Sequence, residues 1–91
     1  MVIARHFRIR GHVQGVGYRY FARENALRLG VCGYVRNLPG GDVEVHAEAE
    51  PEVLDRFLVE LKRGPAFSGV ADVEQEAAAV TGQYSTFQIR G

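Results

Sequence analysis

The sequence contains a single cysteine, Cys32, among its 91 residues. An internal disulfide is therefore impossible, and a zinc site built from several thiolates is excluded as well. We expect Cys32 to be a small buried residue, because free cysteine is among the residue types most often found in protein interiors.

An excess of charge of one sign is also lacking, because eleven Lys and Arg residues balance eleven Asp and Glu residues. A nonspecific nucleic-acid-binding protein carries a basic excess, so the zero net charge argues against nucleic acid as a partner. No apolar run approaches the ~20 residues that a membrane-spanning helix needs. The alternation of Arg with apolar residues near the N-terminus is unlike a signal peptide. We therefore expect a cytoplasmic protein with no membrane partner.

The amino-acid composition is typical of a folded protein. Apolar residues make up 46% of the sequence and charged residues 24%, which is ordinary for a globular chain and excludes a disordered one. A length of 91 residues suffices for one domain and is too short for two. The sequence therefore predicts a single domain, residues 1–91, that exists as a monomer.

Two helices are predicted from apolar residues spaced three and four apart. The first begins at Tyr18 and ends at Gly30, a residue suited to the left-handed backbone that often terminates a helix. The second begins at Pro51, because proline is favoured at the first helical position. Gly64 and Pro65 stop it.

Alternation of apolar and polar residues predicts the strands. Four are expected, at residues 2–10, 31–38, 43–49 and 86–90. A fifth strand near residue 70 contains a β-bulge, because Val70 and Val73 have opposite parity. The order strand, helix, strand, strand, helix, strand predicts an α+β, ferredoxin-like two-layer sandwich. In this βαββαβ fold, two helices cover one face of a mostly antiparallel sheet of four or five strands.

The segment from Gly11 to Arg19 joins the first strand to the first helix and contains three glycines. The N–H groups at a helix N-terminus are unpaired and carry a positive partial charge, so they attract anions. Glycines let successive N–H groups approach one oxyanion, and Arg19 offers two parallel donors to phosphate oxygens. The spacing alone is equally typical of an anion-binding loop and of an ordinary turn. It is not the loop of nucleotide-binding ATPases, because no Lys-Ser/Thr pair follows the glycines.

Two motifs resemble the signatures of a known family. Residues 11–19, GHVQGVGYR, resemble the pattern G-x-V-Q-G-V-x-[aromatic]-R. Residues 33–44, GYVRNLPGGDVE, resemble the pattern G-[aromatic]-V-x-N-x-x-x-G-x-V-E. Both patterns are signatures of the acylphosphatase family, and they occur here in the family's order and separation. Gly64-Pro65 and Phe87-Gln88-Ile89 also fit, so the resemblance covers almost the whole chain.

The resemblance implies hydrolysis of a small-molecule acyl phosphate to a carboxylate and inorganic phosphate, without a metal or another cofactor. It implies that the Arg19 guanidinium clamps the phosphoryl oxygens and that the Asn37 side chain orients the attacking water. It also implies that the second strand lies beside the first, which would put Asn37 next to the loop. The residues whose backbone N–H groups are implied to hold the phosphoryl group are Gln14, Gly15, Val16, Gly17, Tyr18 and Arg19.

Three alternatives share the predicted fold. The first is a noncatalytic ferredoxin-like module that binds an anion or another small ligand. The second is an RNA-recognition domain, which stacks bases on aromatic residues of its central strands; residues 42–48 contain no aromatic, and two glutamates besides an aspartate. The third is a phosphate-binding domain of a larger assembly, since acylphosphatase-like domains also occur in carbamoyl-transferring maturation proteins.

Overall fold

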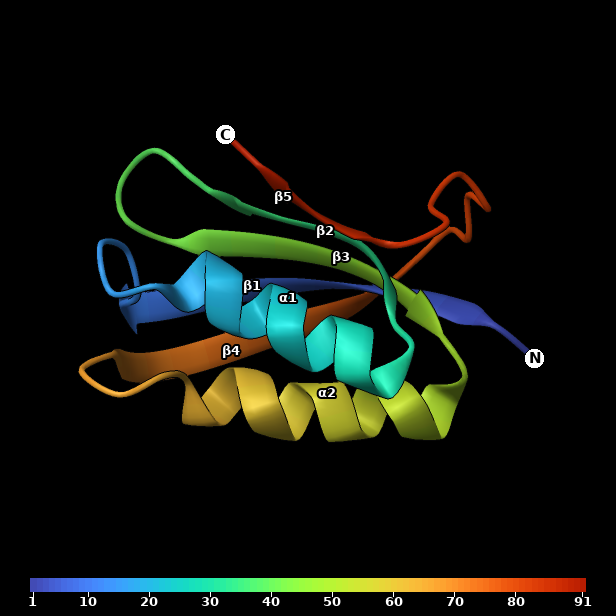
Figure 1. Cartoon of the computed structure of the whole chain (residues 1–91), viewed down its shortest axis with the longest axis horizontal. Helices are drawn as coiled ribbons and strands as arrows, with labels where there is room; N and C mark the ends of the chain where they lie inside the picture. The colour runs from blue at the N-terminus through green and yellow to red at the C-terminus, as the bar shows by residue number, and fades with distance from the viewer.

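Five strands and two helices make up the fold (Figure 1). The structure is a computed structural model that describes all residues from Met1 to Gly91. In chain order the elements are β1 (Ile3–His12), α1 (Tyr18–Leu29), β2 (Cys32–Asn37), β3 (Val43–Ala49), α2 (Pro51–Arg63), β4 (Gly69–Ala78) and β5 (Phe87–Arg90).

Both helices lie where the sequence predicts them. Helix α1 begins at Tyr18, and Gly30 ends it with a φ angle of 78°. Such a left-handed residue is favourable for glycine and strained for other residues. Helix α2 begins with Pro51 and carries Lys62 and Arg63 in its last turn, where they complement the helix dipole.

The sheet has the strand order β4-β1-β3-β2-β5. Its pairs are antiparallel except β2 with β5, which run parallel. Figure 1 shows α1 and α2 side by side on one face of the sheet, which leaves the other face uncovered. The predicted ferredoxin-like α+β sandwich with a mostly antiparallel sheet is confirmed.

The expectation that β2 lies beside β1 is wrong, because β3 lies between them. Val45 of β3 pairs with Phe7 on one side and with Val35 on the other. The connection through α1 places β2 one strand position away from β1 in the sheet. The short turn after Asn37 then reverses the chain, so that β3 fills the position between β1 and β2. β3 suits this central place because Val43, Val45 and Ala47 are fully buried.

The edge strand β4 contains the predicted bulge. Its register with β1 shifts where Arg10 pairs with Asp72 and Gly11 pairs with Val70. Ala71 is therefore the extra residue, and the side chains on either side of it change face. This explains the opposite parity of the two valines that flank it.

Sixteen buried residues form the core between the sheet and the helices. Phe57 of α2 contacts Phe7 and Phe87 with ring centroids 6.1 and 5.8 Å apart. Cys32 is only half-buried, so the expectation of a core cysteine is wrong. In β2 the buried residues are Gly33 and Val35, and Cys32 has the opposite parity.

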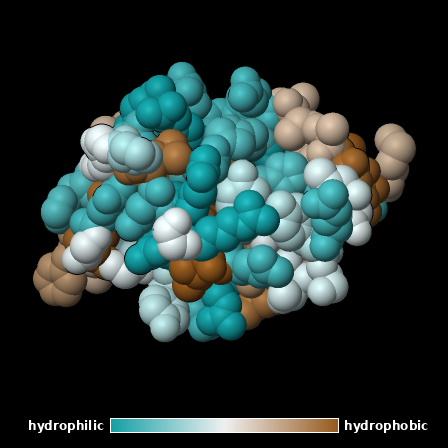
Figure 2. Space-filling view, turned by 90° about the horizontal axis from the view of Figure 1, so that it is seen from above, coloured by the Kyte–Doolittle hydropathy of each residue, from teal (hydrophilic) through white to brown (hydrophobic).

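The surface carries no broad apolar patch in the view of Figure 2, where hydrophilic side chains predominate and hydrophobic residues form small separate groups. The exposed large apolar residues come from scattered places in the sequence, such as Val2, Val59 and Phe67. Neither helix has the length and apolar character needed to span a lipid bilayer.

Candidate active site

Two glycines shape the loop between β1 and α1. Gly15 and Gly17 have φ angles of 76° and 77°, in the left-handed region that glycine adopts without strain. Gly17 is the N-cap of α1, and no side chain caps the helix there. The first turn also contains no acidic residue. The positive end of the helix dipole therefore has no compensating charge from its own element.

Consecutive backbone N–H groups in this loop have no partner in the protein. None of the residues from Gln14 to Tyr20 donates a backbone hydrogen bond; the first that does is Phe21, to the carbonyl oxygen of Gly17 at 3.0 Å. A run of free N–H groups at a helix N-terminus is a favourable site for an anion such as phosphate.

A cavity of about 110 Å³ lies against the loop. It brings together Arg19 from α1 and Asn37 from β2, although β3 separates β2 from the strand that precedes the loop. The cavity lining contains no carboxylate, so its charge favours an anion. The lining residues are Val13, Gly15, Gly17, Tyr18, Arg19, Tyr20 and Asn37. Of the six residues predicted to hold phosphate, Gln14 and Val16 are not in this lining.

Asn37 lines this cavity and carries a polar atom that the protein leaves unsatisfied. Its Oδ1 is buried and has no hydrogen-bond partner in the protein. Asn37 is the last residue of β2, where it pairs with Val43 of β3. Leaving a buried acceptor unpaired costs about 1–3 kcal/mol. The Asn37 carboxamide therefore retains an acceptor for a hydrogen-bond donor that the protein itself does not supply.

The Arg19 side chain is positioned by a residue near the C-terminus. Its Nη1 donates a hydrogen bond to the carbonyl oxygen of Arg90 in β5 at 3.1 Å. The guanidinium group of Arg90 in turn lies over the ring of Tyr34, 4.1 Å from the ring centroid. A guanidinium has five N–H donors, so Arg19 keeps others for an anion while one is used for positioning.

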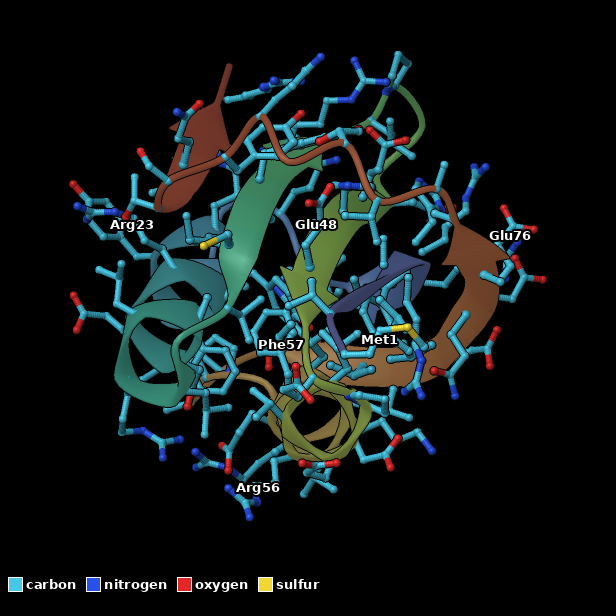
Figure 3. All side chains as sticks on the ribbon, turned by 90° about the vertical axis from the view of Figure 1, so that its right-hand side faces the viewer. Met1, Arg23, Glu48, Arg56, Phe57 and Glu76 are labelled. Atoms are coloured by element: carbon cyan, nitrogen blue, oxygen red, sulfur yellow. The ribbon has the colours of Figure 1, made fainter.

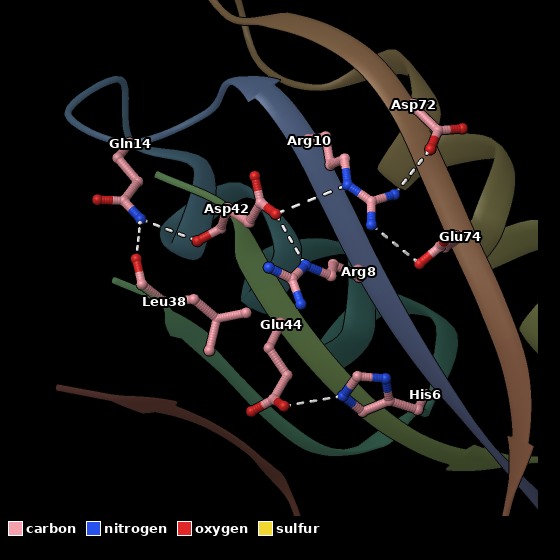
Figure 4. A network of polar contacts seen from close by, with 9 residues as sticks. All are labelled: His6, Arg8, Arg10, Gln14, Leu38, Asp42, Glu44, Asp72 and Glu74. Atoms are coloured by element: carbon pink, nitrogen blue, oxygen red, sulfur yellow. Dashed lines mark hydrogen bonds and ion pairs between the residues drawn. The ribbon is translucent and has the colours of Figure 1, made fainter. Parts of the chain in front are cut away.

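The side chains of Tyr18 and Gln14 make structural contacts. The Tyr18 hydroxyl donates a hydrogen bond to the carbonyl oxygen of Leu61 at 2.6 Å, and burial raises the pKa of this hydroxyl. The Gln14 carboxamide donates to the carbonyl oxygens of Leu38 and Asp42 (Figure 4). Both residues therefore link the loop to other elements of the fold.

The Acylphosphatase family model matches residues 5–89. The chain belongs to the acylphosphatase family. An acylphosphatase of Solibacter usitatus is 48% identical over 87 residues, which cover 96% of this chain and 90% of the relative. An acylphosphatase of Archaeoglobus fulgidus is 43% identical over 88 residues, covering 97% and 98%. The crystal structure of acylphosphatase from Bacillus subtilis matches with a TM-score of 0.93 and 32% identity, covering 100% of both chains.

Membership of the acylphosphatase family confirms the resemblance on which the functional prediction depends. Acylphosphatases are hydrolases, so the chain is assigned to an enzyme family rather than to the noncatalytic or RNA-binding alternatives. The roles of the individual residues remain predictions. In the whole structure, no group of three or more His, Cys, Asp and Glu side chains is placed to hold a metal ion.

Three features of this candidate site were not predicted from the motifs. Tyr20 lines the cavity with 67% of its surface exposed, but it lies outside both motifs. The carbonyl of Arg90 leaves no sequence signal, because any residue supplies a backbone acceptor. The side-chain role of Gln14 did leave a sequence signal. The motif specifies glutamine at this position, whereas a position that supplies only its backbone N–H would accept other residues as well.

Proposed function

We propose that this cavity is the catalytic site and that it hydrolyses the carboxyl-phosphate bond of small acyl phosphates without a metal ion. One observation carries the proposal: free backbone N–H groups from Gln14 to Tyr20 lie beside a cavity that Arg19 and Asn37 also line, and Asn37 Oδ1 has no partner in the protein. Phosphoryl transfer requires positioning and charge stabilisation more than covalent chemistry, and these groups can supply both.

The phosphoryl group is bound by the backbone N–H groups of residues 14–19 and by the Arg19 guanidinium. Negative charge spreads over the three equatorial oxygens as the phosphorus–oxygen bond to the leaving group stretches. Donors that already point at those oxygens stabilise this charge without having to reorganise. The Arg90 carbonyl, 3.1 Å from Arg19 Nη1, restricts the guanidinium before substrate binds.

The attacking water is oriented by Asn37. Its Oδ1 accepts a hydrogen bond from one water proton, which turns a lone pair of the water oxygen toward phosphorus. A new phosphorus–oxygen bond forms to this water while the bond to the acyl oxygen breaks. The carboxylate departs with the electron pair of the broken bond, and both protons of the water remain on the inorganic phosphate, which is formed as dihydrogen phosphate. Such positioning contributes mainly to turnover.

The leaving group explains why no general acid is needed. It is a carboxylate, whose conjugate acid has a pKa of about 4 by comparison with Asp and Glu side chains. It therefore departs as an anion at neutral pH without being protonated. The cavity offers no carboxylate or histidine for such a role, which is consistent with this chemistry.

We also propose that a single copy of this chain forms the complete site. The free N–H groups, Arg19, Asn37 and the carbonyl of Arg90 all come from one chain and span most of its length. A monomer consisting of one domain, residues 1–91, is therefore sufficient for activity.

Hydrolysis of benzoyl phosphate by the purified protein in the presence of a chelator tests the proposal. We expect turnover without added metal and competitive inhibition by inorganic phosphate. Arg19→Ala should lower kcat/KM by about a thousandfold, the scale on which a charge-stabilising arginine acts. Asn37→Ala should lower kcat by about a hundredfold with little change in the inhibition constant of phosphate.

Two outcomes would contradict the proposal. Loss of activity with the chelator would exclude the metal-free reaction. Unchanged turnover in both variants would show that the reaction takes place elsewhere on the protein.

A further inference from the structure

The side chain of Gln14 connects the loop to the hairpin that carries Asn37. Its Nε2 donates to the carbonyl oxygen of Leu38 at 2.9 Å and to that of Asp42 at 2.8 Å (Figure 4). Because both acceptors are carbonyl oxygens, only the NH₂ end of the carboxamide can face them. The two acceptors flank the turn between β2 and β3.

The turn between β2 and β3, which Gln14 contacts, is stabilised by hydrogen bonds and ion pairs of its own. The Leu38 N–H donates to the Asp42 carbonyl at 2.8 Å. The Asp42 carboxylate accepts from Arg8 Nε at 2.7 Å, and Arg10 Nε lies 3.7 Å from the same oxygen. Arg10 continues the network to β4 (Figure 4). Ion pairs and hydrogen bonds therefore connect the turn between β2 and β3 to the sheet. The hydrogen bonds of Gln14 connect the loop between β1 and α1 to this turn.

Asn37 needs such a connection because its Oδ1 has no partner in the protein. Its place relative to the loop depends on the backbone at the end of β2, and Leu38 is the next residue along that backbone. The loop and the end of β2 are not hydrogen-bonded strands, since β3 lies between β2 and β1. The two hydrogen bonds of Gln14 span this gap.

We propose that the Gln14 side chain is a positioning residue that sets the distance between the loop's N–H groups and the Asn37 carboxamide. This inference rests on the proposed function, in which the loop binds the phosphoryl group and Asn37 orients the water. The loop N–H groups and Arg19 bind phosphate by themselves, whereas water attack requires that Asn37 be placed correctly with respect to them. Gln14 therefore acts on turnover rather than on phosphate affinity.

Gln14→Leu, which removes both hydrogen bonds while keeping a similar volume, tests this role in a double-mutant cycle with Asn37→Ala. We expect Gln14→Leu to lower kcat for benzoyl phosphate about tenfold and to change the inhibition constant of inorganic phosphate less than about threefold. In the Asn37→Ala background the same substitution should lower kcat by less than about threefold, because the group that it positions is already gone.

The control is Gln75→Leu, the same chemical change at an exposed position of β4. It should leave kcat and phosphate inhibition unchanged. Free energies of unfolding, measured for all variants, separate any loss of folded protein from a change in turnover.

If Gln14→Leu does not fold, Gln14→Glu provides a second test. An ionised carboxylate there faces two carbonyl oxygens and is repelled, whereas a protonated carboxyl donates one hydrogen bond to them. The ratio of variant to wild-type kcat should therefore rise as the pH is lowered through the pKa of the new carboxyl. A ratio independent of pH would overturn the inference.

Other results also decide the question. Equal losses of kcat in the two backgrounds, an unchanged kcat in Gln14→Leu, or a phosphate inhibition constant that rises in parallel with the loss of kcat would each overturn the role of Gln14. With an active wild-type protein these results leave the proposed function intact. An inactive wild-type protein would overturn the proposed function, and the inference with it.

Discussion

Glycine meets two different requirements in this chain, as Gly15 and Gly33 illustrate. Both have positive φ angles, 76° and 144°. At Gly15 an added Cβ would contact nothing within 4 Å, so only the backbone conformation requires glycine there. At Gly33 an added Cβ would overlap the carbonyl oxygen of His46 in the adjacent strand. The first glycine shapes the loop between β1 and α1, and the second permits β2 and β3 to pair closely.

We expect alanine substitutions at these two glycines to differ in their effect on stability. Gly15→Ala should lower the free energy of unfolding by about 1–2 kcal/mol, the penalty for a left-handed residue with a Cβ. Gly33→Ala should lower it by about 3 kcal/mol or more, because the strands must also move apart. Urea denaturation measures both values. Equal losses would contradict the view that strand contact, and not φ alone, requires glycine at position 33.

At the scale of elements, the segment from residue 79 to 86 links the two opposite edges of the sheet, β4 and β5. Figure 3 shows this connection crossing the end of the sheet above Glu48 of β3. The Glu48 carboxylate accepts hydrogen bonds from Thr81 N at 3.0 Å, Thr81 Oγ1 at 2.8 Å and Gly82 N at 3.2 Å. His46 Nε2 lies 2.6 Å from the same side chain. Glu48 thus fixes the path that leads to β5, whose Arg90 carbonyl contacts Arg19.

The ionisation of Glu48 should make stability depend on pH. Burial opposes ionisation, but the hydrogen bonds from His46, Thr81 and Gly82 prevail and lower the pKa of Glu48 to about 2. In the unfolded chain this carboxyl takes up its proton at a higher pH, because its pKa there is about 4.3, as in model peptides. The stabilisation is therefore complete above about pH 5 and is lost as the pH falls toward 2.

Glu48→Gln tests this dependence. We expect the variant to be less stable than the wild type at pH 7, and the difference to shrink between about pH 5 and pH 2. Free energies of unfolding measured by urea denaturation across this range give both curves. Parallel curves would show that Glu48 does not contribute to the acid sensitivity of the fold.

At the scale of the whole molecule, one core joins both helices to the sheet. Phe57 lies between α2 and the sheet in Figure 3, and its ring packs edge-on against Phe7 of β1 and Phe87 of β5. These contacts connect the first strand, the second helix and the last strand. The molecule should therefore unfold as one cooperative unit.

Phe57→Ala should lower the free energy of unfolding by about 3–5 kcal/mol, because it leaves a cavity where three elements meet. Val59→Ala, on the same helix at a side chain that is 62% exposed, is the matched control and should change stability by less than about 0.5 kcal/mol. Far-UV circular dichroism and tyrosine fluorescence should follow the same denaturation curve in each protein. Separate transitions would contradict a single cooperative unit.

Much of the fold and part of the site could be predicted because their causes are local. The apolar stripe and the flanking Gly30 and Pro51 were sufficient to place both helices, and parity alone indicated the bulge in β4. The loop of residues 14–19 followed from its glycines and from the motif. The half-exposure of Cys32 could not be predicted, because the face of a strand that meets the helices depends on packing with other elements.

The amino-acid sequence by itself determined the helices and strands, the glycine loop, and the residue types available at the site. These depend on backbone preferences and on periodicities within a few neighbouring residues. Only the tertiary structure decided that β3 separates β1 from β2, that Asn37 meets Arg19 at one cavity, and that Gln14 bridges the gap between loop and hairpin. Those features depend on contacts between residues far apart in the chain, and such contacts form only when the whole core packs.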